Sequence, residues 1–314
     1  MKRPYLLATL AAGFPAVANH AHAHGYAGDH LFISTLLIDD PFMADEASLP
    51  TFSYLPQPGS DPVPNQYMAN FEFDKRITET FGFVINGGYT WLTRPGDKTA
   101  NGWNNLVLTL KDQVYVNAPH EFVMSVGVQR VFARTGANGS NGAVLDNDDS
   151  SSTAPTLYFG KGFGDLPIGL LRPLALTGEL SYSIADKKLK VDETGTPINN
   201  GISNGWSGGL TLQYSMRYLS SQVKDYGFPA WVNRLTPLVE LSWSSPASKP
   251  TTAVTEYLWG VGAAYTTSYY ALTAEMLIPG NRNTGSHIGV IAQFHLYFDD
   301  IFPHSLGKPI TGWF

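Results

Sequence analysis

The chain has 314 residues, of which 13% are aromatic and only 15% are charged, whereas about a quarter of the residues in a typical soluble domain are charged. It contains no cysteine, which excludes disulfides, thiolate metal sites and a cysteine nucleophile. Its net charge is −6, with 20 basic and 26 acidic residues. This balance argues against nucleic acid as a partner, because such binding depends on Lys and Arg neutralising phosphates.

The first 23 residues have the three parts of a secretory signal peptide. Lys2 and Arg3 form a charged start, residues 6–18 are apolar, and A-H-A at 21–23 is a small-residue cleavage site. The apolar run is shorter than the roughly 20 residues that a helix needs to span a bilayer, and no later stretch is long and apolar enough. We therefore expect cleavage after residue 23, export of the remaining chain and no transmembrane helix.

Residues 24–47 precede the first long alternating segment and form a region of their own. Their one apolar stretch, residues 31–38, fits an extra strand, a plug that enters a lumen, or a periplasmic arm; we favour an arm or plug. His24 would carry a free amine after cleavage, and with Asp29 and His30 it offers ligands that suit copper. A flexible, solvated terminus is the simpler interpretation, so we predict no metal site and no cofactor.

From about residue 48 onward, apolar and polar residues alternate with period two in twelve segments. This period is typical of strands, since successive side chains on a strand point to opposite faces. Several segments exceed the usual strand length and approach the 9–11 residues of a tilted strand that spans a membrane. The predicted strands are residues 48–56, 67–76, 81–93, 103–117, 121–133, 154–162, 173–185, 205–220, 234–245, 254–266, 268–279 and 286–299.

The links between these segments alternate between short and long. Links such as 117–120 and 266–268 are tight, whereas others are long and polar. Outer-membrane barrels have short periplasmic turns, longer outside loops and an even number of strands, so the chain fits that scheme with both ends in the periplasm. The links at 162–172 and 223–233 are long for the periplasmic side, and the second could contain a short helix. Residues 300–314 are expected to form a periplasmic tail.

The fold class that these patterns predict is all-β: a transmembrane antiparallel up-and-down barrel of about twelve strands over residues 48–299. The alternation alone also fits a soluble sandwich with its charged side chains outside. Aromatic residues gather near the strand ends, as in the interfacial girdles of membrane barrels, whereas in a sandwich they would fill the core. Together with strand length, this favours a barrel whose apolar face points to lipid.

Three stretches carry a resemblance to a known group of bacterial proteins: DEASLPTFSYLPQP at 45–58, FEFDKRITETFGFVINGGYTWL at 71–92, and NAPHEFVMSVGV at 117–128. The chain resembles the porin-like outer-membrane proteins grouped as transporters of the phenol-degradation meta-pathway type. The resemblance implies a barrel in the cell outer membrane for passive movement of small solutes, aromatic or hydrophobic ones among them. The expected partners are outer-membrane lipid and a small solute. The oligomeric state is left open.

Positively and negatively charged side chains occupy the alternate strand positions that point away from lipid. Inside a barrel they either pair and fill the bore or line a path for a solute, and an unpaired charge in a dry section is costly. We expect Arg217 to be held by at least one glutamate beside a narrow path. The lumen-lining candidates are Glu72, Asp74, Arg76, Lys111, Gln113, Glu179, Arg217, Glu240, Glu275 and His295.

Two other functions stay open from the sequence. A structural or adhesion barrel would act through its outside loops. An outer-membrane lipid hydrolase would need Ser, His and an orienting group within hydrogen-bond reach. The nearest pairs are Ser286-His287 and His120-Glu121, and neighbours on a strand point to opposite faces. We therefore predict a channel or transporter rather than an enzyme, with no catalytic residues.

Overall fold

The structure, a computed structural model, describes residues 25–59, 63–93, 96, 99–136, 150–199, 201–251 and 253–313. The predicted signal peptide, residues 1–23, lies outside these ranges. None of the helices in the described part of the chain has the length and apolar character needed to cross a bilayer.

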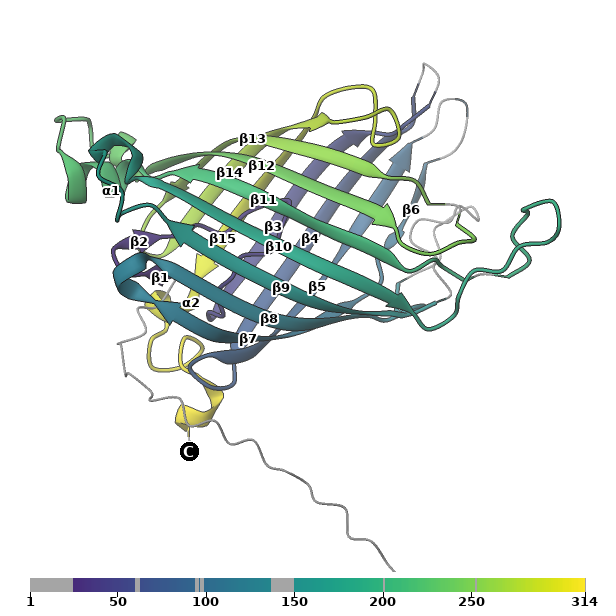
Figure 1. The fold of residues 1–314 in the computed structure, drawn as a ribbon, viewed down its shortest axis with the longest axis horizontal. Coiled ribbons are helices and arrows are strands. Elements are labelled where there is room, and N and C mark those ends of the chain that lie inside the picture. Colours follow the sequence, from purple (N-terminus) through teal and green to yellow (C-terminus); the bar gives the residue numbers. More distant parts are fainter. Residues whose placement is uncertain are drawn as a thin grey trace, which may run out of the picture.

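Twelve long antiparallel strands of the described residues close into a barrel (Figure 1). Each long strand pairs with the next one in the chain, and the last pairs with the first, which closes the sheet. Closure is required in lipid, because every backbone N–H and C=O group must find its partner within the protein. The strands are β3 (Glu46–Pro56), β4 (Asn65–Arg76), β5 (Phe81–Thr93), β7 (Val107–Asn117), β8 (Phe122–Val131), β9 (Ser152–Gly162), β10 (Leu174–Ala185), β11 (Gly205–Tyr214), β12 (Leu235–Pro246), β13 (Glu256–Thr266), β14 (Tyr270–Pro279) and β15 (Gly289–Tyr297).

The predicted fold class is confirmed, and the twelve predicted segments correspond one to one to these strands. Two of them differ in detail. The segment 103–117 is interrupted: a short strand, β6 (Ala100–Trp103), pairs with β5, and the chain leaves the sheet before β7 begins. The segment 205–220 is too long, because the hydroxyl of Ser215 accepts a hydrogen bond from the backbone N–H of Tyr218 (3.1 Å) and begins the helix α1 (Met216–Tyr218).

The links divide the barrel into two unlike ends, named here the turn end and the loop end. The turn end carries the links 77–80, 118–121, 163–173, 215–234 and 267–269, together with α2 (Phe298–Ile301) and the C-terminal tail (Figure 1). The link 215–234 contains the helical turns η4 (Leu219–Val223) and η5 (Val232–Arg234), which overlap the two ends of the stretch 223–233, where a short helix was considered from the sequence. Short turns mark the periplasmic side of outer-membrane barrels, so we expect the turn end to face the periplasm.

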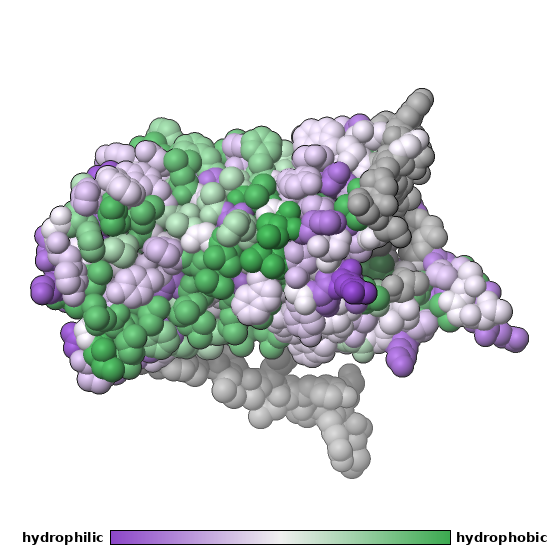
Figure 2. All heavy atoms as spheres, turned by 90° about the horizontal axis from the view of Figure 1, so that it is seen from above, coloured by the Kyte–Doolittle hydropathy of each residue, from purple (hydrophilic) through white to green (hydrophobic). Residues whose placement is uncertain are grey.

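The two faces of the strands follow the predicted parity. Figure 2 shows a largely hydrophobic zone over the strands between more hydrophilic ends. Leu110, Leu210 and Met276 expose 44–50% of their surface on the outer face, whereas Thr109 and Thr211, which have the opposite parity, are buried inside. Aromatic side chains lie at both ends of the wall, with Trp103 and Trp206 among those at the loop end and Tyr115 and Tyr269 at the turn end. Such rings suit the two membrane interfaces.

Candidate functional site in the barrel lumen

The N-terminal region enters the barrel at the turn end. A hairpin of β1 (Tyr26–Ala27) and β2 (His30–Leu31) lies beside the link 118–121. Residues 32–45, named here the lumenal segment, then run inside the barrel and return to β3 (purple in Figure 1). Most side chains of this segment are buried, which removes their apolar surface from water and packs it against the inner wall.

The wall on one side of the lumenal segment supplies hydrogen-bond acceptors. The carboxylate of Glu240, at the middle of β12, accepts from the backbone N–H groups of residue 36 (3.0 Å) and residue 37 (2.8 Å). Glu179 on β10 accepts from the N–H of Asp39 (3.1 Å), and Gln213 on β11 accepts from that of Ile33 (3.2 Å). Three neighbouring strands thus bind the backbone of the segment. Charge-assisted bonds of this kind offset the cost of burying a carboxylate.

A second part of the wall, β7 and β8, supplies hydrogen-bond donors. Lys111 on β7 is fully buried, and its Nζ donates to the carboxylate of Asp39 (2.9 Å) and to the carbonyls of Asp40 and Phe42 (both 3.1 Å). The hydroxyl of Ser125 on β8 donates to the carbonyl of residue 41. The lumenal segment is therefore fixed between acceptors on β10–β12 and donors on β7–β8.

A buried ionic cluster fixes the point where the segment returns to the sheet at the turn end. Asp45 accepts from Lys75 Nζ (2.8 Å), from the backbone N–H of Arg76 (2.8 Å) and from Arg76 Nε (3.0 Å). The same guanidinium donates to Asp299 Oδ1 (2.8 Å). Burial raises the pKa of Asp299 to about 8, although Arg76 opposes the rise. We call Asp45, Lys75, Arg76 and Asp299 the floor cluster.

A second polar group holds the hairpin at the turn end. His30 is fully buried. The centroid of its ring lies 5.1 Å from that of Phe32 and 5.0 Å from that of Tyr218. Its Nδ1 lies 3.7 Å from Glu121, which also accepts from the Tyr218 hydroxyl at 2.8 Å. Burial, with a smaller contribution from Lys161, lowers the pKa of His30 to about 4. Burial also raises the pKa of Glu121.

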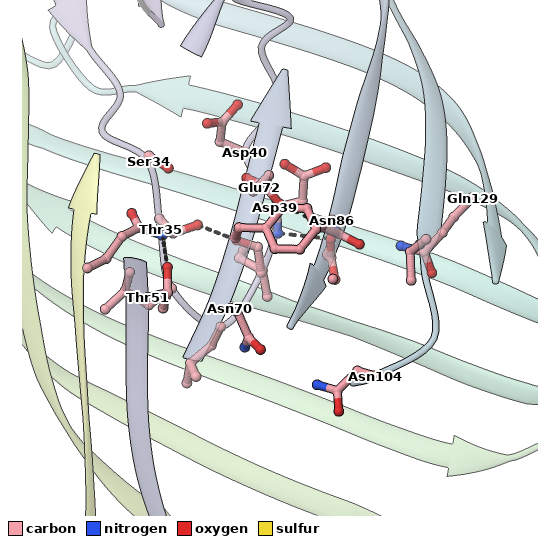
Figure 3. Close-up of a pocket in the computed structure, with 18 of the residues that line it drawn as sticks. Ser34, Thr35, Asp39, Asp40, Thr51, Asn70, Glu72, Asn86, Asn104 and Gln129 are labelled. Atoms are coloured by element: carbon pink, nitrogen blue, oxygen red, sulfur yellow. Dashed lines mark hydrogen bonds between the residues drawn. The ribbon is translucent and has the colours of Figure 1, made fainter. Parts of the chain in front are cut away.

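A cavity of about 420 Å³, named here the chamber, lies between the lumenal segment and the wall formed by β4, β5 and the chain around β7 and β8. Figure 3 shows residues of the lumenal segment on one side of it and side chains of the wall on the other. Of the described residues that border the chamber, none is basic. Its polar lining includes the carboxyl groups of Asp39, Asp40, Glu72 and Glu179 and the amides of Asn70, Asn86, Asn104, Asn105, Gln129 and Gln293.

The structure distributes the predicted lumen residues over three places. Glu72 and Glu179 border the chamber, whereas Lys111 and Glu240 bind the lumenal segment. Arg76 belongs to the floor cluster. The remaining inward-facing candidates, buried against the wall or the turn end, are Asp74, Glu275 and His295; the His295 Nδ1 lies 2.8 Å from the Ser48 hydroxyl and its Nε2 lies 3.1 Å from the Glu46 carboxylate.

The last two predicted residues, Arg217 and Gln113, lie toward the turn end and outside the chamber. Arg217 is exposed in α1 at the turn end, far along the wall from the mid-strand glutamates, because β11 stops at Tyr214. The predicted pairing of Arg217 with a glutamate beside the bore is therefore wrong. Gln113 is half-buried where β7 departs from regular pairing near the turn end, so it does not border the chamber.

The sequence analysis missed the acids of the lumenal segment and the amides of the wall. Asp39 and Asp40 lie before the first barrel strand, so the alternation along the strands could not predict which way their side chains point. Asn70 and Asn86 do occupy inward parity on predicted strands and could have been found by the same alternation that identified Glu72. Asn104 and Asn105 lie where the sheet is interrupted, and no periodic signal marks them.

The residues considered for metal binding and catalysis lie at opposite ends of the barrel or outside the described residues. His24 lies outside the described residues, and within the described ranges no group of three or more His, Asp or Glu is arranged to hold a metal ion. Ser286 and His287 are exposed in a link at the loop end. His120 is exposed at the turn end, where its Nδ1 lies 3.3 Å from Asp165.

The fold places the chain in a class of proteins. No family model and no curated protein sequence matches it. Among solved structures, the COG4313 outer membrane channel from Pseudomonas putida F1 is similar with a TM-score of 0.55 and 10% identity, over 84% of this chain and 99% of that one. The NanC porin (TM-score 0.48, 8% identity, 80% and 98% coverage) and the β domain of the Bordetella autotransporter BrkA (0.47, 16%, 81% and 99%) also align.

The closed barrel, its apolar outer wall and the likeness to the first of these structures define an outer-membrane β-barrel. The chain therefore resides in the outer membrane, with its inward-facing residues and lumenal segment shielded from lipid.

Proposed function

We propose that this protein is a narrow outer-membrane channel for small, hydrogen-bonding solutes, with a preference for cations. The observation that carries the proposal is the chamber: four carboxyl groups and several amides border it, and none of its described lining residues is basic. Rings and clusters of acidic side chains raise the local concentration of cations in a pore. The positive charge of the nearby Lys111 is already bound by Asp39 and two carbonyls.

The size of the bore sets the size of the solute. A barrel of twelve strands lies between eight-stranded barrels filled by side chains and the wide sixteen-stranded porins. Here the lumenal segment occupies part of that bore. The chamber of about 420 Å³ would hold on the order of fourteen water molecules, taking about 30 Å³ for each. This volume suits a single small metabolite.

The chemistry of the chamber bears on the kind of solute. The resemblance noted in the sequence implies aromatic or hydrophobic solutes. The apolar side chains at the chamber, such as Leu36, Leu37 and Val107, are few beside its polar groups. A hydrophobic solute entering it would leave carboxylates and amides without hydrogen-bond partners, which is costly. We therefore favour a polar solute that donates hydrogen bonds.

Conductance measurements test this proposal. Refolded protein in a planar bilayer with a KCl gradient should give a reversal potential of the sign expected for cation preference. Glu72→Gln should lower the cation-to-anion permeability ratio by roughly a few-fold, because it removes a charge from the narrow path. Glu193→Gln, at an exposed site on an outside loop, is the matched control and should change it little.

Anion preference in the unaltered protein, or equal effects of the two substitutions, would overturn the proposal. No conductance in the unaltered protein would instead favour a structural or adhesion barrel that works through its outside loops.

A further inference from the structure

The two longest links at the turn end expose apolar side chains beyond the ends of the strands. The other links at this end have three or four residues, whereas these span 163–173 and 215–234. Both contain helical turns, η3 (Gly169–Leu171) in the first and α1, η4 and η5 in the second. Their exposed apolar residues are Ile168 (58%), Leu170 (54%), Leu171 (39%), Tyr226 (48%), Phe228 (44%) and Trp231 (60%).

Two hydrogen bonds attach these links to the lipid-facing side of the barrel. Tyr214 has the outward parity of Leu210 and Leu212, and its hydroxyl donates to the carbonyl of Leu170 (3.2 Å). Arg234 donates to the hydroxyl of Tyr265 (3.2 Å), which also has outward parity. The exposed apolar residues therefore continue the outer wall of the barrel toward the periplasm.

The two links also pack against each other. The backbone of Gly169 approaches Val223 so closely that a side chain at residue 169 would meet the Val223 Cγ1 at 3.1 Å. The contact joins η3 to η4, so both links form one surface. Figure 1 shows α1 and the following link projecting beyond the ends of the strands at the turn end.

The charged residues of this surface are mainly basic. Arg172, Arg217, Lys224 and Arg234 lie in the two links, against Asp165 and Asp225. Asp165 already binds Lys161 (3.0 Å) and His120 (3.3 Å), and the Lys224 Nζ lies 5.0 Å from the centroid of the Tyr226 ring. Trp, Tyr and basic residues together are typical of membrane–water interfaces, where the rings lie at headgroup level and the cations meet phosphates.

We propose that the links 163–173 and 215–234 form a membrane-binding surface that lies in the headgroup layer of the periplasmic leaflet. Its apolar side chains enter the boundary of the acyl chains, and its basic side chains bind lipid phosphates. Phospholipid is the occupant because the surface is continuous with the lipid-facing wall and carries complementary charge. The inference rests on the position of the barrel in the outer membrane and does not require that the barrel conducts.

The absence of cysteine allows a direct test. Full-length protein with a single substitution, Ile168→Cys, Phe228→Cys or Trp231→Cys, is labelled with a nitroxide and reconstituted into vesicles of phosphatidylethanolamine and phosphatidylglycerol. Thr194→Cys, on an exposed outside loop, is the control. Collision with oxygen should dominate at the three link positions, as expected 5–10 Å into an interface, whereas collision with a water-soluble nickel chelate should dominate at residue 194.

Heat-modifiable gel migration of each labelled protein confirms that the barrel has folded before the measurement. Dominant collision with nickel at residues 168 and 231 would overturn the proposal. The proposal would also be overturned if the nickel chelate reached the labels in vesicles but not in native outer membranes. A protein partner, and not lipid, would then cover the surface.

The ionic part of the proposal has its own test. Lys224→Gln should make the label at residue 228 shallower in vesicles containing phosphatidylglycerol and leave it unchanged in vesicles of phosphatidylcholine alone. Equal depths in the two kinds of vesicle, with and without the substitution, would show that attraction of the basic residues to anionic lipid plays no part.

Discussion

Lys111 and Asp39 form an ion pair of 2.9 Å that joins the barrel wall to the lumenal segment. The lysine side chain is completely buried, and its other two hydrogen bonds go to carbonyls of the same segment. The backbone of that segment is bound on its other side by Glu179, Gln213 and Glu240. The position of the segment therefore depends on residues of both walls, and substitutions on either wall should move it.

Lys111→Gln should lower the stability of the barrel strongly. The substitution leaves the Asp39 carboxylate and two carbonyls without their donor, and breaking a buried pair commonly costs about 3–5 kcal/mol. Thermal unfolding of the refolded protein, followed by gel migration, measures the loss. Arg130→Gln, which removes an ion pair with Asp186 at the surface, is the control and should change the unfolding temperature little. Similar losses in both variants would contradict the buried role of Lys111.

Leu210→Arg and Gln129→Arg should have opposite consequences. Leu210 is 45% exposed on the lipid face, and arginine at the membrane midplane costs about 2–4 kcal/mol in a barrel. Gln129 borders the acidic chamber, so arginine there should be tolerated and should lower cation preference. Folding yield into lipid vesicles and reversal potential measure the two effects. Equal folding yields would mean that residue 210 does not face lipid.

Gly260→Ala should disturb the lumenal segment near Leu37. A Cβ at residue 260 would overlap the Glu275 carboxylate and lie 3.1 Å from the Leu37 side chain, so both must shift. We expect a loss of stability of about 1–3 kcal/mol, as for other overpacked interiors, and faster cleavage of the segment by added protease. Gly205→Ala, whose Cβ would meet only a carbonyl at 3.3 Å, is the control. Unchanged cleavage rates would contradict the close packing at residue 260.

The N-terminal hairpin should be released from the turn end as the pH falls. His30 has an ordinary pKa near 6.5, and burial lowers it to about 4 when the hairpin is docked. The released hairpin therefore binds more protons between these values, and docking weakens as the pH falls from about 6.5 toward 4. The charged and titratable groups about the ring are Glu121, Lys161, Tyr218 and Asp29.

Limited proteolysis of the hairpin at pH 7.5 and pH 5 measures this release. Cleavage should be faster at pH 5 in the unaltered protein, and His30→Phe should remove most of the difference. Faster cleavage at pH 5 that persists in His30→Phe would contradict the assignment to His30. Glu121 would not explain it, because its raised pKa makes docking stronger, not weaker, as the pH falls.

The strands could be predicted from the sequence because the signal is local. In the barrel wall, apolar and polar residues alternate, so the period of two alone predicts that Leu210 faces lipid and that Thr211 faces the lumen. The same rule failed at Arg217, where alternation continues past Tyr214 while a side-chain cap at Ser215 has already ended the strand. A cap of one residue is too small a signal to outweigh the alternation around it.

The contacts of the lumenal segment could not be predicted in the same way. The N–H of Leu36 meets Glu240 across 204 residues of chain, and the bond uses the backbone rather than a recognisable side chain. The neighbouring acids Asp39 and Asp40 can be seen in the sequence. Lys111 was predicted only to line the lumen, with no particular acid as its partner. Which acid binds that lysine depends on how far the segment enters the barrel.

The floor cluster lies at the junction where the first long strand meets the last. Asp45 directly precedes β3 and Asp299 follows β15, so Arg76 joins the two sides of that junction, although it lies 223 positions before Asp299 in the chain. Bringing such distant parts of a chain together has the largest loop-closure entropy of any strand pairing in the barrel. The cluster thus adds ionic contacts at the closing seam of the barrel, where the two paired strands, β3 and β15, are farthest apart in the chain.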